Sequence, residues 1–235
     1  MDLSIVVPVH NEAGNLAVLQ KEIIEAMAKT GFEYEIIYVD DASSDSSGQI
    51  LKGLVEEDQK VKVISFERNR GQSEALLAGF KNSQGRWILT LDADGQNPPE
   101  DFSQFIPFCQ SYDFITGIRK NRKDRFIKKA SSWVAKIFRR LVLGDTTEDT
   151  GCSLRMFKRE IIETISDLRN FHRFFTFLVR LQGFSVKETY VQHRQRQSGQ
   201  SNYRTWGRLW QGWFDLWSLY RLKKRMARHE VINQR

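Results

Sequence analysis

The chain has 235 residues, of which 40% are hydrophobic, and this length allows one sizeable core without a division into two domains. It contains only two cysteines, Cys109 and Cys152, which excludes a disulfide framework and favours a reducing compartment. We expect no signal peptide, because Met1 and Asp2 lead directly into a predicted strand. No uncharged apolar run approaches the roughly 18 residues of a membrane span.

The net charge of +7 hides an asymmetry along the chain. Residues 1–115 contain 9 Lys and Arg against 19 Asp and Glu, a net charge of −10. Residues 116–235 contain 27 against 10, a net charge of +17. The basic half is therefore expected to meet an anionic partner, either nucleic acid or a membrane surface.

Short apolar strands alternate with helical segments in the first half of the chain. Strands are predicted at 3–9, 34–39, 61–66 and 87–91, and helices at about 13–30, 46–58 and 71–83. The alternation shows no hairpin signals, so it favours an α/β fold with a mostly parallel sheet covered on both faces. In such sheets a ligand binds in the crevice beyond the carboxyl ends of the strands.

Polar residues follow each of these strands and are expected to converge at one edge of the sheet. They are Asn11, Asp40, Asp41, Asn69, Asp92 and Asp94. A bare Asp-x-Asp is often only a solvated acidic turn, but the second acidic pair at another strand end favours a site. Asp92, Asp94 and the Gln96 amide are hard oxygen ligands that suit Mg²⁺ or Mn²⁺ bound together with a substrate diphosphate.

Two later segments have large apolar residues at helical spacing with Lys and Arg between them. The first is Phe126–Leu143, which suits either core packing or a membrane interface. The second carries the aromatic series Tyr203, Trp206, Trp210, Trp213, Trp217 and Tyr220. This series favours an amphipathic helix lying in a bilayer interface over ordinary core packing. A partner membrane protein or a second copy of the chain also suits the second segment.

Four sequence blocks together resemble the GT-A, family 2 glycosyltransferases. They are Pro8-Val9-His10-Asn11-Glu12, Val39-Asp40-Asp41 with Ser44-Asp45, Asn69-Arg70-Gly71 with Ala75 and Gly79, and Asp92-Ala93-Asp94-Gly95-Gln96 with Pro98-Pro99-Glu100. Within that family the chain most resembles the polyprenyl-phosphate (dolichyl-phosphate) sugar synthases, over nearly its whole length. The resemblance implies a GT-A Rossmann-like fold, a nucleotide sugar donor such as GDP-mannose or a UDP-hexose, and a dolichyl or undecaprenyl phosphate acceptor.

The resemblance also implies roles for individual residues. Asp94, with Asp92 and Gln96, would hold the metal and offset the diphosphate charge. The donor would be bound by Pro8, Asn11, Glu12, Asp40, Asp41, Asn69, Gly71, Asp92 and Ala93. A lipid phosphate is already anionic and needs cationic positioning rather than a general base. Arg119, which ends a short motif expected after the fifth strand, is the first candidate, followed by Lys128 with Ser132. Lys128 also suits a merely solvated basic face.

The second half of the chain contains two further family blocks. Asp149–Lys158 resembles a block that closes over the donor sugar. In it, Asp149 would contact a sugar hydroxyl or cap a helix, and Arg155 would pair with Asp149 or reach a phosphate. His193–Tyr203 resembles a loop ending in Gly-x-Ser-x-Tyr that binds the donor diphosphate, with Arg194, Ser201 and Tyr203 as contacts.

The resulting expectation is a catalytic domain at 1–201, with a nucleotide and metal half at 1–115 and an acceptor half at 116–201. A membrane-interface helix and basic tail would follow at 202–235. The enzyme would be an inverting glycosyltransferase, peripherally bound at the cytoplasmic membrane face. Two alternatives stay open: transfer to a saccharide or protein hydroxyl with Asp145, Glu148 or Asp149 as base, and a non-catalytic membrane- or nucleic-acid-binding module. Nucleic acid is not the expected partner.

Overall fold

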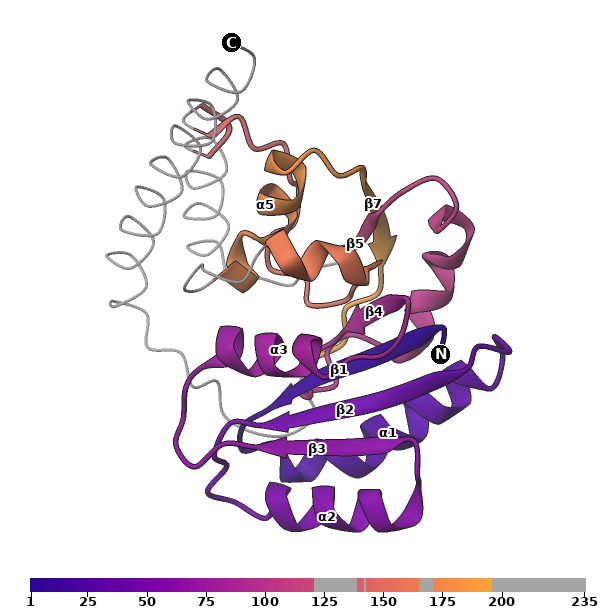
Figure 1. The fold of residues 1–235 in the computed structure, drawn as a ribbon, viewed down its shortest axis with the longest axis vertical. Helices are drawn as coiled ribbons and strands as arrows, with labels where there is room; N and C mark the ends of the chain where they lie inside the picture. The colour runs from indigo at the N-terminus through magenta and orange to yellow at the C-terminus, as the bar shows by residue number, and fades with distance from the viewer. Residues whose placement is uncertain (121–138, 142, 165–170, 196–235) are drawn as a thin grey trace. The chain divides into compact units, whose positions relative to one another are not determined.

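A computed structural model of the chain describes residues 1–120, 139–141, 143–164 and 171–195, and it has the predicted α/β architecture (Figure 1). Its sheet has seven strands in the order β3-β2-β1-β4-β6-β5-β7. Their bounds are β1 Leu3–Val9, β2 Tyr34–Asp40, β3 Val61–Ser65, β4 Trp87–Thr90, β5 Phe114–Arg119, β6 Arg155–Lys158 and β7 Val186–Val191. Strands β1 to β4 pair in parallel, as do β5 and β7, whereas β6 is antiparallel to both of its neighbours.

Four described α-helices lie beside this sheet: α1 (Ala13–Met27), α2 (Ser47–Glu57), α3 (Gln72–Lys81) and α5 (Phe175–Leu181). Short 3₁₀ segments, η1 to η4, cover Pro99–Gln104, Ile106–Phe108, Arg159–Thr164 and Phe171–Arg173. Figure 1 shows α1 and α2 on one face of β1 to β3 and α3 on the other. The first three helices and the first four strands confirm the sequence prediction, with differences of a few residues at their ends.

The alternation of side chains along the strands explains why both faces of the sheet are covered. Along β1, Ile5 and Val7 belong to one apolar cluster with Leu16 and Leu19 of α1. Val6 points to the opposite face, where a Cβ atom built on Gly79 of α3 would lie only 2.3 Å from its Cγ1 atom. Because α3 packs this closely on the sheet, its first turn is fixed against the carboxyl ends of β1 and β2.

The face of the sheet near α5 is filled by aromatic side chains. Phe80, Phe114, Phe157, Phe171 and Phe175 are each at most 1% exposed. The rings of Phe157 and Phe175 are 4.9 Å apart at their centroids, and those of Phe114 and Phe175 are 5.0 Å apart, both edge to face. This geometry is favourable for aromatic pairs, so α3, β5, β6 and α5 share one rigid core.

Strands β5, β6 and β7 are joined at one end by Asp113. Its carboxylate accepts hydrogen bonds from Lys158 Nζ (2.6 Å) and from Ser185 N and Oγ (2.9 and 2.6 Å). Burial disfavours the charged form of Asp113, but the Lys158 ammonium and the Ser185 donors outweigh it and lower its pKa to about 2. The prediction that Thr116–Arg119 follows the fifth strand is wrong: these are the last four residues of β5, since Thr116 pairs with Arg155 and Arg119 with Val191.

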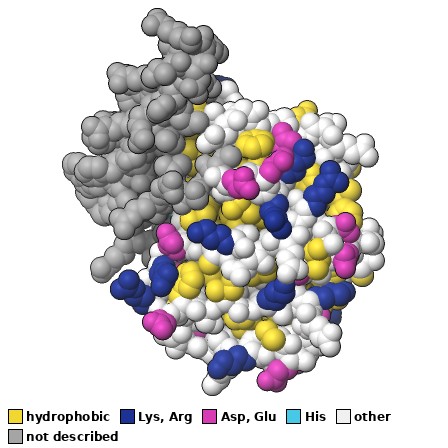
Figure 2. All heavy atoms as spheres, viewed as in Figure 1, with side chains coloured by type: hydrophobic (Ala, Val, Ile, Leu, Met, Phe, Trp, Pro, Cys, Tyr) yellow, Lys and Arg dark blue, Asp and Glu magenta, His cyan; other side chains and the backbone are white. Residues whose placement is uncertain are grey.

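All seven strands belong to one compact unit, whose described residues are 1–120, 149–164 and 171–195. The described residues 139–141 and 143–148 belong to a second unit, in which Asp145 Oδ1 accepts hydrogen bonds from the backbone N–H and the hydroxyl of Thr147. Figure 2 shows Lys and Arg side chains interspersed with Asp and Glu side chains on one face of the described residues. The predicted boundary at 201 and the predicted helix at 202–235 lie outside the described residues and stay predictions.

Candidate functional site

The carboxyl ends of β1, β2 and β4 bring the first group of predicted residues to one edge of the sheet. Asp40 and Asp41 are 7% and 4% exposed. Both carboxylate oxygens of Asp41 accept backbone N–H groups, from Arg70 at 2.6 Å and from Gly71 at 2.8 Å. Gly71 has a φ of +88°, which favours glycine. Asp41 therefore fixes the loop between β3 and α3, while Asp40 Oδ1 accepts Ser43 N at 3.0 Å.

The loop after β1 is fixed in a similar way, with Pro8 still inside the strand. The side-chain oxygen of Asn11 accepts backbone N–H groups of Ser44 (2.7 Å) and Asp45 (3.3 Å), and Asn11 itself has a φ of +58°. Glu12 Oε2 accepts Asn15 Nδ2 at 2.6 Å. The loops after β1 and β2, which meet through residues 33 and 34 positions apart in sequence, are thus joined into one rim around Asp40.

His10 brings Asn69 to the same rim, a contact that the sequence reasoning missed. Its Nδ1 lies 2.8 Å from the Asp41 carbonyl oxygen, and the Asn69 amide nitrogen lies 3.3 Å from the same ring nitrogen. Asn69 is exposed, so it lies at the outer side of the rim. A sequence signal existed, because His10 stands between two predicted contact residues, Pro8 and Asn11, directly after a strand.

Asp92 and Asp94 follow β4, with the buried Ala93 between them. Burial and the negative charge of Asp94 raise the pKa of Asp92 to about 6. Asp94 Oδ1 accepts the backbone N–H of Gln96 at 3.1 Å, across a turn in which Gly95 has a φ of +70°. The predicted metal-ligand set therefore lies on one tight turn, and its two carboxylates interact electrostatically.

Two residues absent from the predicted site, Gln72 and Ser153, contact Asp92, and a third, Asn97, contacts Ser153. The Gln72 amide donates to Asp92 Oδ1 at 2.7 Å, and the Asp92 backbone N–H donates to Ser153 Oγ at 3.2 Å. Ser153 Oγ also accepts Asn97 Nδ2 at 2.9 Å. A hydrogen bond from Ser153 lowers the pKa of Asp92, against the effects of burial and Asp94. Gln72 directly follows the Asn69-Arg70-Gly71 block, which was the available sequence signal.

Arg119 and Asp149 form a bidentate ion pair. Arg119 Nε and Nη2 lie 2.7 and 2.8 Å from the two carboxylate oxygens, and the side chains are 12% and 10% exposed. Burial raises the pKa of Asp149, but the Arg119 charge and hydrogen bonds outweigh it and hold that pKa below its ordinary value. The negative charge of Asp92 acts on Arg119 as well. The pair uses two guanidinium nitrogens and leaves Nη1 outside it.

The structure pairs Asp149 with Arg119, not with Arg155, and places Arg155 inside the sheet. Arg155 is the first residue of β6 and is 5% exposed. Its Nη2 donates to the Thr150 carbonyl oxygen at 3.1 Å, and its guanidinium lies 5.8 Å from the Phe175 ring centroid. The last four residues of the Asp149–Lys158 block therefore form strand β6, in which Met156 and Phe157 are core residues.

The segment after β7 is anchored on the turn that carries Asp94. The Arg194 backbone N–H donates to the Gln96 carbonyl oxygen at 2.8 Å. The Arg194 guanidinium makes ion pairs with Glu22 (2.6 Å) and Glu100 (3.6 Å). The backbone hydrogen bond from Arg194 to Gln96 brings the start of the predicted diphosphate loop to the turn that carries Asp94. The charge of the Arg194 side chain is paired with the Glu22 and Glu100 carboxylates.

Several predicted residues lie outside the described part of the chain. They are Lys128, Ser132, Ser201 and Tyr203, together with most of the 126–143 segment and the whole aromatic series to Tyr220. Among the described residues, no helix is long and apolar enough to cross a bilayer. The same residues contain no group of three or more His, Cys, Asp or Glu side chains arranged around a common point, so the predicted metal site depends on two carboxylates and an amide.

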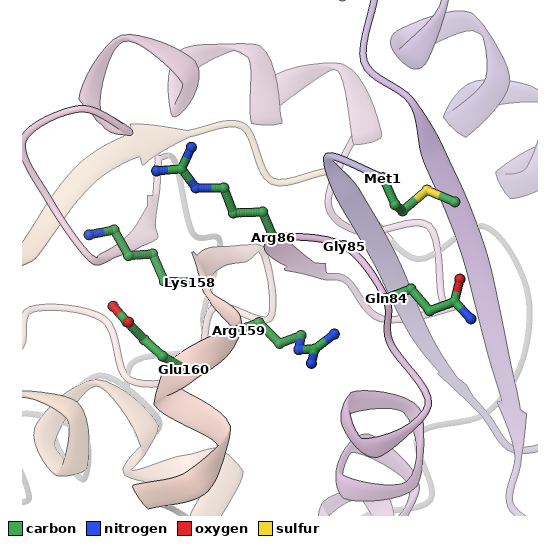
Figure 3. Close-up of a pocket in the computed structure, with 7 residues that line it drawn as sticks. All are labelled: Met1, Gln84, Gly85, Arg86, Lys158, Arg159 and Glu160. Atoms are coloured by element: carbon green, nitrogen blue, oxygen red, sulfur yellow. The ribbon is translucent and has the colours of Figure 1, made fainter.

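A pocket of about 380 Å³ lies at the other end of the strands (Figure 3). Its lining combines residues before β1 and β4 with the last residue of β6 and the first two residues of η3: Met1, Gln84, Gly85, Arg86, Lys158, Arg159 and Glu160. Trp87 pairs with Lys158 in the antiparallel register, which places this pocket at the amino ends of β1 and β4. It is therefore separate from the acidic edge of the sheet.

Comparison with known proteins identifies the family. Residues 4–166 match the model of "Glycosyl transferase family 2", and the chain belongs to this family. Its sheet is the GT-A Rossmann-like fold. An undecaprenyl-phosphate 4-deoxy-4-formamido-L-arabinose transferase of Pectobacterium carotovorum is 34% identical over 204 residues, which are 86% of this chain and 62% of that protein. The chain thus spans less than two thirds of the length of this relative.

Solved structures confirm the fold at low sequence identity. Glucosyl-3-phosphoglycerate synthase of Mycobacterium tuberculosis, solved with Mn²⁺, UDP and glucosyl-3-phosphoglycerate, has a TM-score of 0.67 at 14% identity. The match covers 94% of this chain and 79% of that one. A mannosyltransferase of Pyrobaculum calidifontis in complex with GDP-mannose and Mn²⁺ has a TM-score of 0.59 at 16% identity, covering 85% and 58% of the two chains.

Proposed function

We propose that this chain transfers a sugar from a nucleotide sugar to a polyprenyl phosphate. The observation that carries the proposal is the joint placement of Asp40, Asp92 and Asp94 at one edge of the sheet, in a family 2 chain. The relatives named as undecaprenyl-phosphate sugar transferases support this class of acceptor. In an open α/β sheet, this edge is where a nucleotide ligand binds.

The donor nucleotide would lie against the rim formed by Asn11, Asp40 and Asn69. The Asp41 carboxylate and the Asn11 amide hold the loops of this rim through backbone N–H groups, so the rim is formed before a ligand binds. A preformed rim loses little conformational entropy on binding. Asp40, nearly buried at the end of β2, is the side chain expected to accept a hydrogen bond from the nucleobase or ribose.

A divalent metal, Mg²⁺ or Mn²⁺, suits the turn after β4. Burial and the negative charge of the Asp94 carboxylate raise the pKa of Asp92, and a divalent cation would relieve the repulsion between the two carboxylates. Asp94, with Asp92 and Gln96, would hold the ion, whose chemistry is to offset the charge that develops on the departing diphosphate. The structural relatives solved with Mn²⁺ support the choice of a divalent ion.

The acceptor phosphate would be positioned by Arg119. A lipid phosphate is already an anion, so it needs a cation to orient it rather than a base to activate it. Asp149 holds the Arg119 guanidinium near Asp92 and leaves Nη1 for an incoming phosphate oxygen. The competing use of Asp149 as a general base for a hydroxyl acceptor is disfavoured, because its ion pair with Arg119 lowers its pKa.

The reaction that follows is a single displacement. An oxygen of the lipid phosphate forms a bond to the anomeric carbon, and the bond from that carbon to the diphosphate oxygen breaks. The leaving nucleoside diphosphate takes the electron pair, and the anomeric configuration inverts. The membrane surface that holds such a lipid would be met by the aromatic and basic segment from Tyr203 to Tyr220, as its sequence pattern indicates.

The test is product formation with undecaprenyl or dolichyl phosphate, Mg²⁺ or Mn²⁺, and a panel of radiolabelled nucleotide sugars. One donor is expected to move label into the organic phase, and Asp94→Ala is expected to abolish this transfer without loss of folding. Since Asp94 is proposed to hold the metal, a fully active Asp94→Ala variant would refute the metal assignment. Hydrolysis of a donor without a lipid product would refute the acceptor.

A further inference from the structure

Gln72 is the first residue of α3 and makes a short polar contact with the turn after β4. Its Nε2 atom lies 2.7 Å from Asp92 Oδ1, whereas the two residues are 20 positions apart in the chain. Both side chains are half-buried, so the hydrogen bond is partly shielded from water. A charge-assisted bond of this length is stronger than one between neutral groups.

The position of Gln72 is fixed independently of Asp92. Helix α3 is held at its start by the two hydrogen bonds from Arg70 and Gly71 to Asp41 and is packed along its length through Gly79. The neighbouring Ser73 is buried, with its Oγ 2.7 Å from His172 Nδ1. The amide of Gln72 is therefore presented from a rigid support, as a positioning group must be.

Asp92 is constrained from a second direction by Ser153. The Ser153 hydroxyl oxygen accepts the Asp92 backbone N–H, and Asn97 Nδ2 donates to the same oxygen. Asn97 is 4% exposed, and the Ser153 carbonyl oxygen accepts Thr90 Oγ1 at 2.7 Å. These contacts fix the backbone at Asp92, while Gln72 reaches one oxygen of its carboxylate.

We propose that Gln72 is a positioning residue that orients the Asp92 carboxylate for the metal and nucleotide of the donor site. This inference rests on the proposed function, because it assigns Asp92 to that site. Groups that hydrogen bond to a metal ligand fix its orientation, and their loss commonly weakens metal binding or activity by about 10- to 100-fold. Helix α3, whose start is held by Asp41, thereby couples the rim around Asp40 to the turn after β4 through a single amide.

The test uses the full chain and Mn²⁺ alone, with free Mn²⁺ followed by its electron paramagnetic resonance signal. Gln72→Met keeps the shape of the side chain and removes the donor. We expect it to weaken Mn²⁺ binding about 10-fold. Gln104→Met is the matched control, since its amide donates to Asp101 Oδ1 at 3.0 Å, outside the site, and we expect wild-type binding. Gln72→Ser, which is too short to reach Asp92, is a second variant with the same expected loss.

A double-mutant cycle shows whether Gln72 acts through Asp92. In an Asp92→Ala background, Gln72→Met is expected to cause no further loss of Mn²⁺ affinity. An equal loss in both backgrounds, or wild-type binding by the folded Gln72→Met and Gln72→Ser proteins, would overturn the inference. If Gln72 only supported the fold, Gln72→Met would lower the melting temperature, and its effect on Mn²⁺ affinity would not depend on Asp92.

This measurement separates the inference from the proposed function. The Mn²⁺ titration needs no sugar donor and no lipid. Coupling between Gln72 and Asp92 with no lipid product would overturn the proposed reaction and leave the role of Gln72 intact. A lipid product from the wild type, without that coupling, would overturn the role of Gln72 alone.

Discussion

Removing Asp149 is expected to destabilise the fold strongly, because it leaves the Arg119 charge buried without its partner. The pair is bidentate, with nitrogen–oxygen distances of 2.7 and 2.8 Å, and both side chains are nearly buried. Two further N–H groups, of Arg119 and Gly151, donate to the same carboxylate. Breaking such a pair costs about 3–5 kcal/mol, so we expect Asp149→Ala to lose about that much unfolding free energy.

Replacing both partners with apolar residues separates the structural role of the pair from its functional role. In Arg119→Met/Asp149→Leu no unpaired charge remains, and such replacements are often neutral or stabilising. We expect urea unfolding at pH 7 to show the double variant recovering most of the lost stability. We also expect it to form no lipid product, because the group that orients the acceptor phosphate is absent.

Two results would contradict these roles of Asp149 and Arg119. A loss of less than about 1 kcal/mol in Asp149→Ala would mean that the Arg119 charge is not buried as described. A stable double variant with wild-type product formation would show that Arg119 only supports the fold. The unfolding midpoints and product yields are measured on the same preparations, so a stability defect cannot be mistaken for a lost contact.

Three other predictions concern the core, the sheet junction and the membrane. Gly79→Ala is expected to cost about 1–3 kcal/mol in urea unfolding, because its Cβ would lie 2.3 Å from Val6 Cγ1; unchanged stability would contradict this packing. Asp113, with a pKa of about 2 against an ordinary 3.8, stabilises the fold above about pH 4. The stability difference between wild type and Asp113→Asn is then expected to fall by about 1–2 kcal/mol as pH falls from 7 toward 2; a difference that stays constant with pH in urea unfolding would refute it. Replacing Trp206, Trp210 and Trp213, three predicted interface residues, with serine is expected to release the chain from anionic liposomes in a flotation assay. Undiminished liposome binding would instead favour core packing for these three side chains.

Local sequence patterns predicted the first half of the sheet because each strand there is a short apolar run. Strand β1 has its predicted bounds, and β4 ends one residue earlier than predicted, at Thr90. Strands β6 and β7 were not predicted. Strand β6 has four residues and begins with a buried arginine, and β7 is a sheet edge whose residues before Val191 are only partly buried or exposed. Neither carries the continuous apolar pattern of a central strand.

The site was predictable as far as it depends on the ends of parallel strands. That rule places Asp40 and Asp92 at one edge without any knowledge of side-chain contacts. The pairing of Arg119 with Asp149 depends on how β5 meets the segment before β6, 30 residues later, and the sequence pattern had suggested Arg155, not Arg119, as the partner of Asp149. The hydrogen bond from Gln72 to Asp92 likewise depends on the packing of α3, which no local pattern encodes.

The most direct test of the proposed reaction identifies both products of one turnover. Mass spectrometry of the lipid and chromatography of the nucleotide, on the same reaction, show which bond breaks. We expect a sugar joined to the lipid through a single phosphate, with one nucleoside diphosphate released for each sugar transferred. A sugar joined through a diphosphate, with release of a nucleoside monophosphate, would contradict it, because the bond broken would then lie between the two donor phosphates.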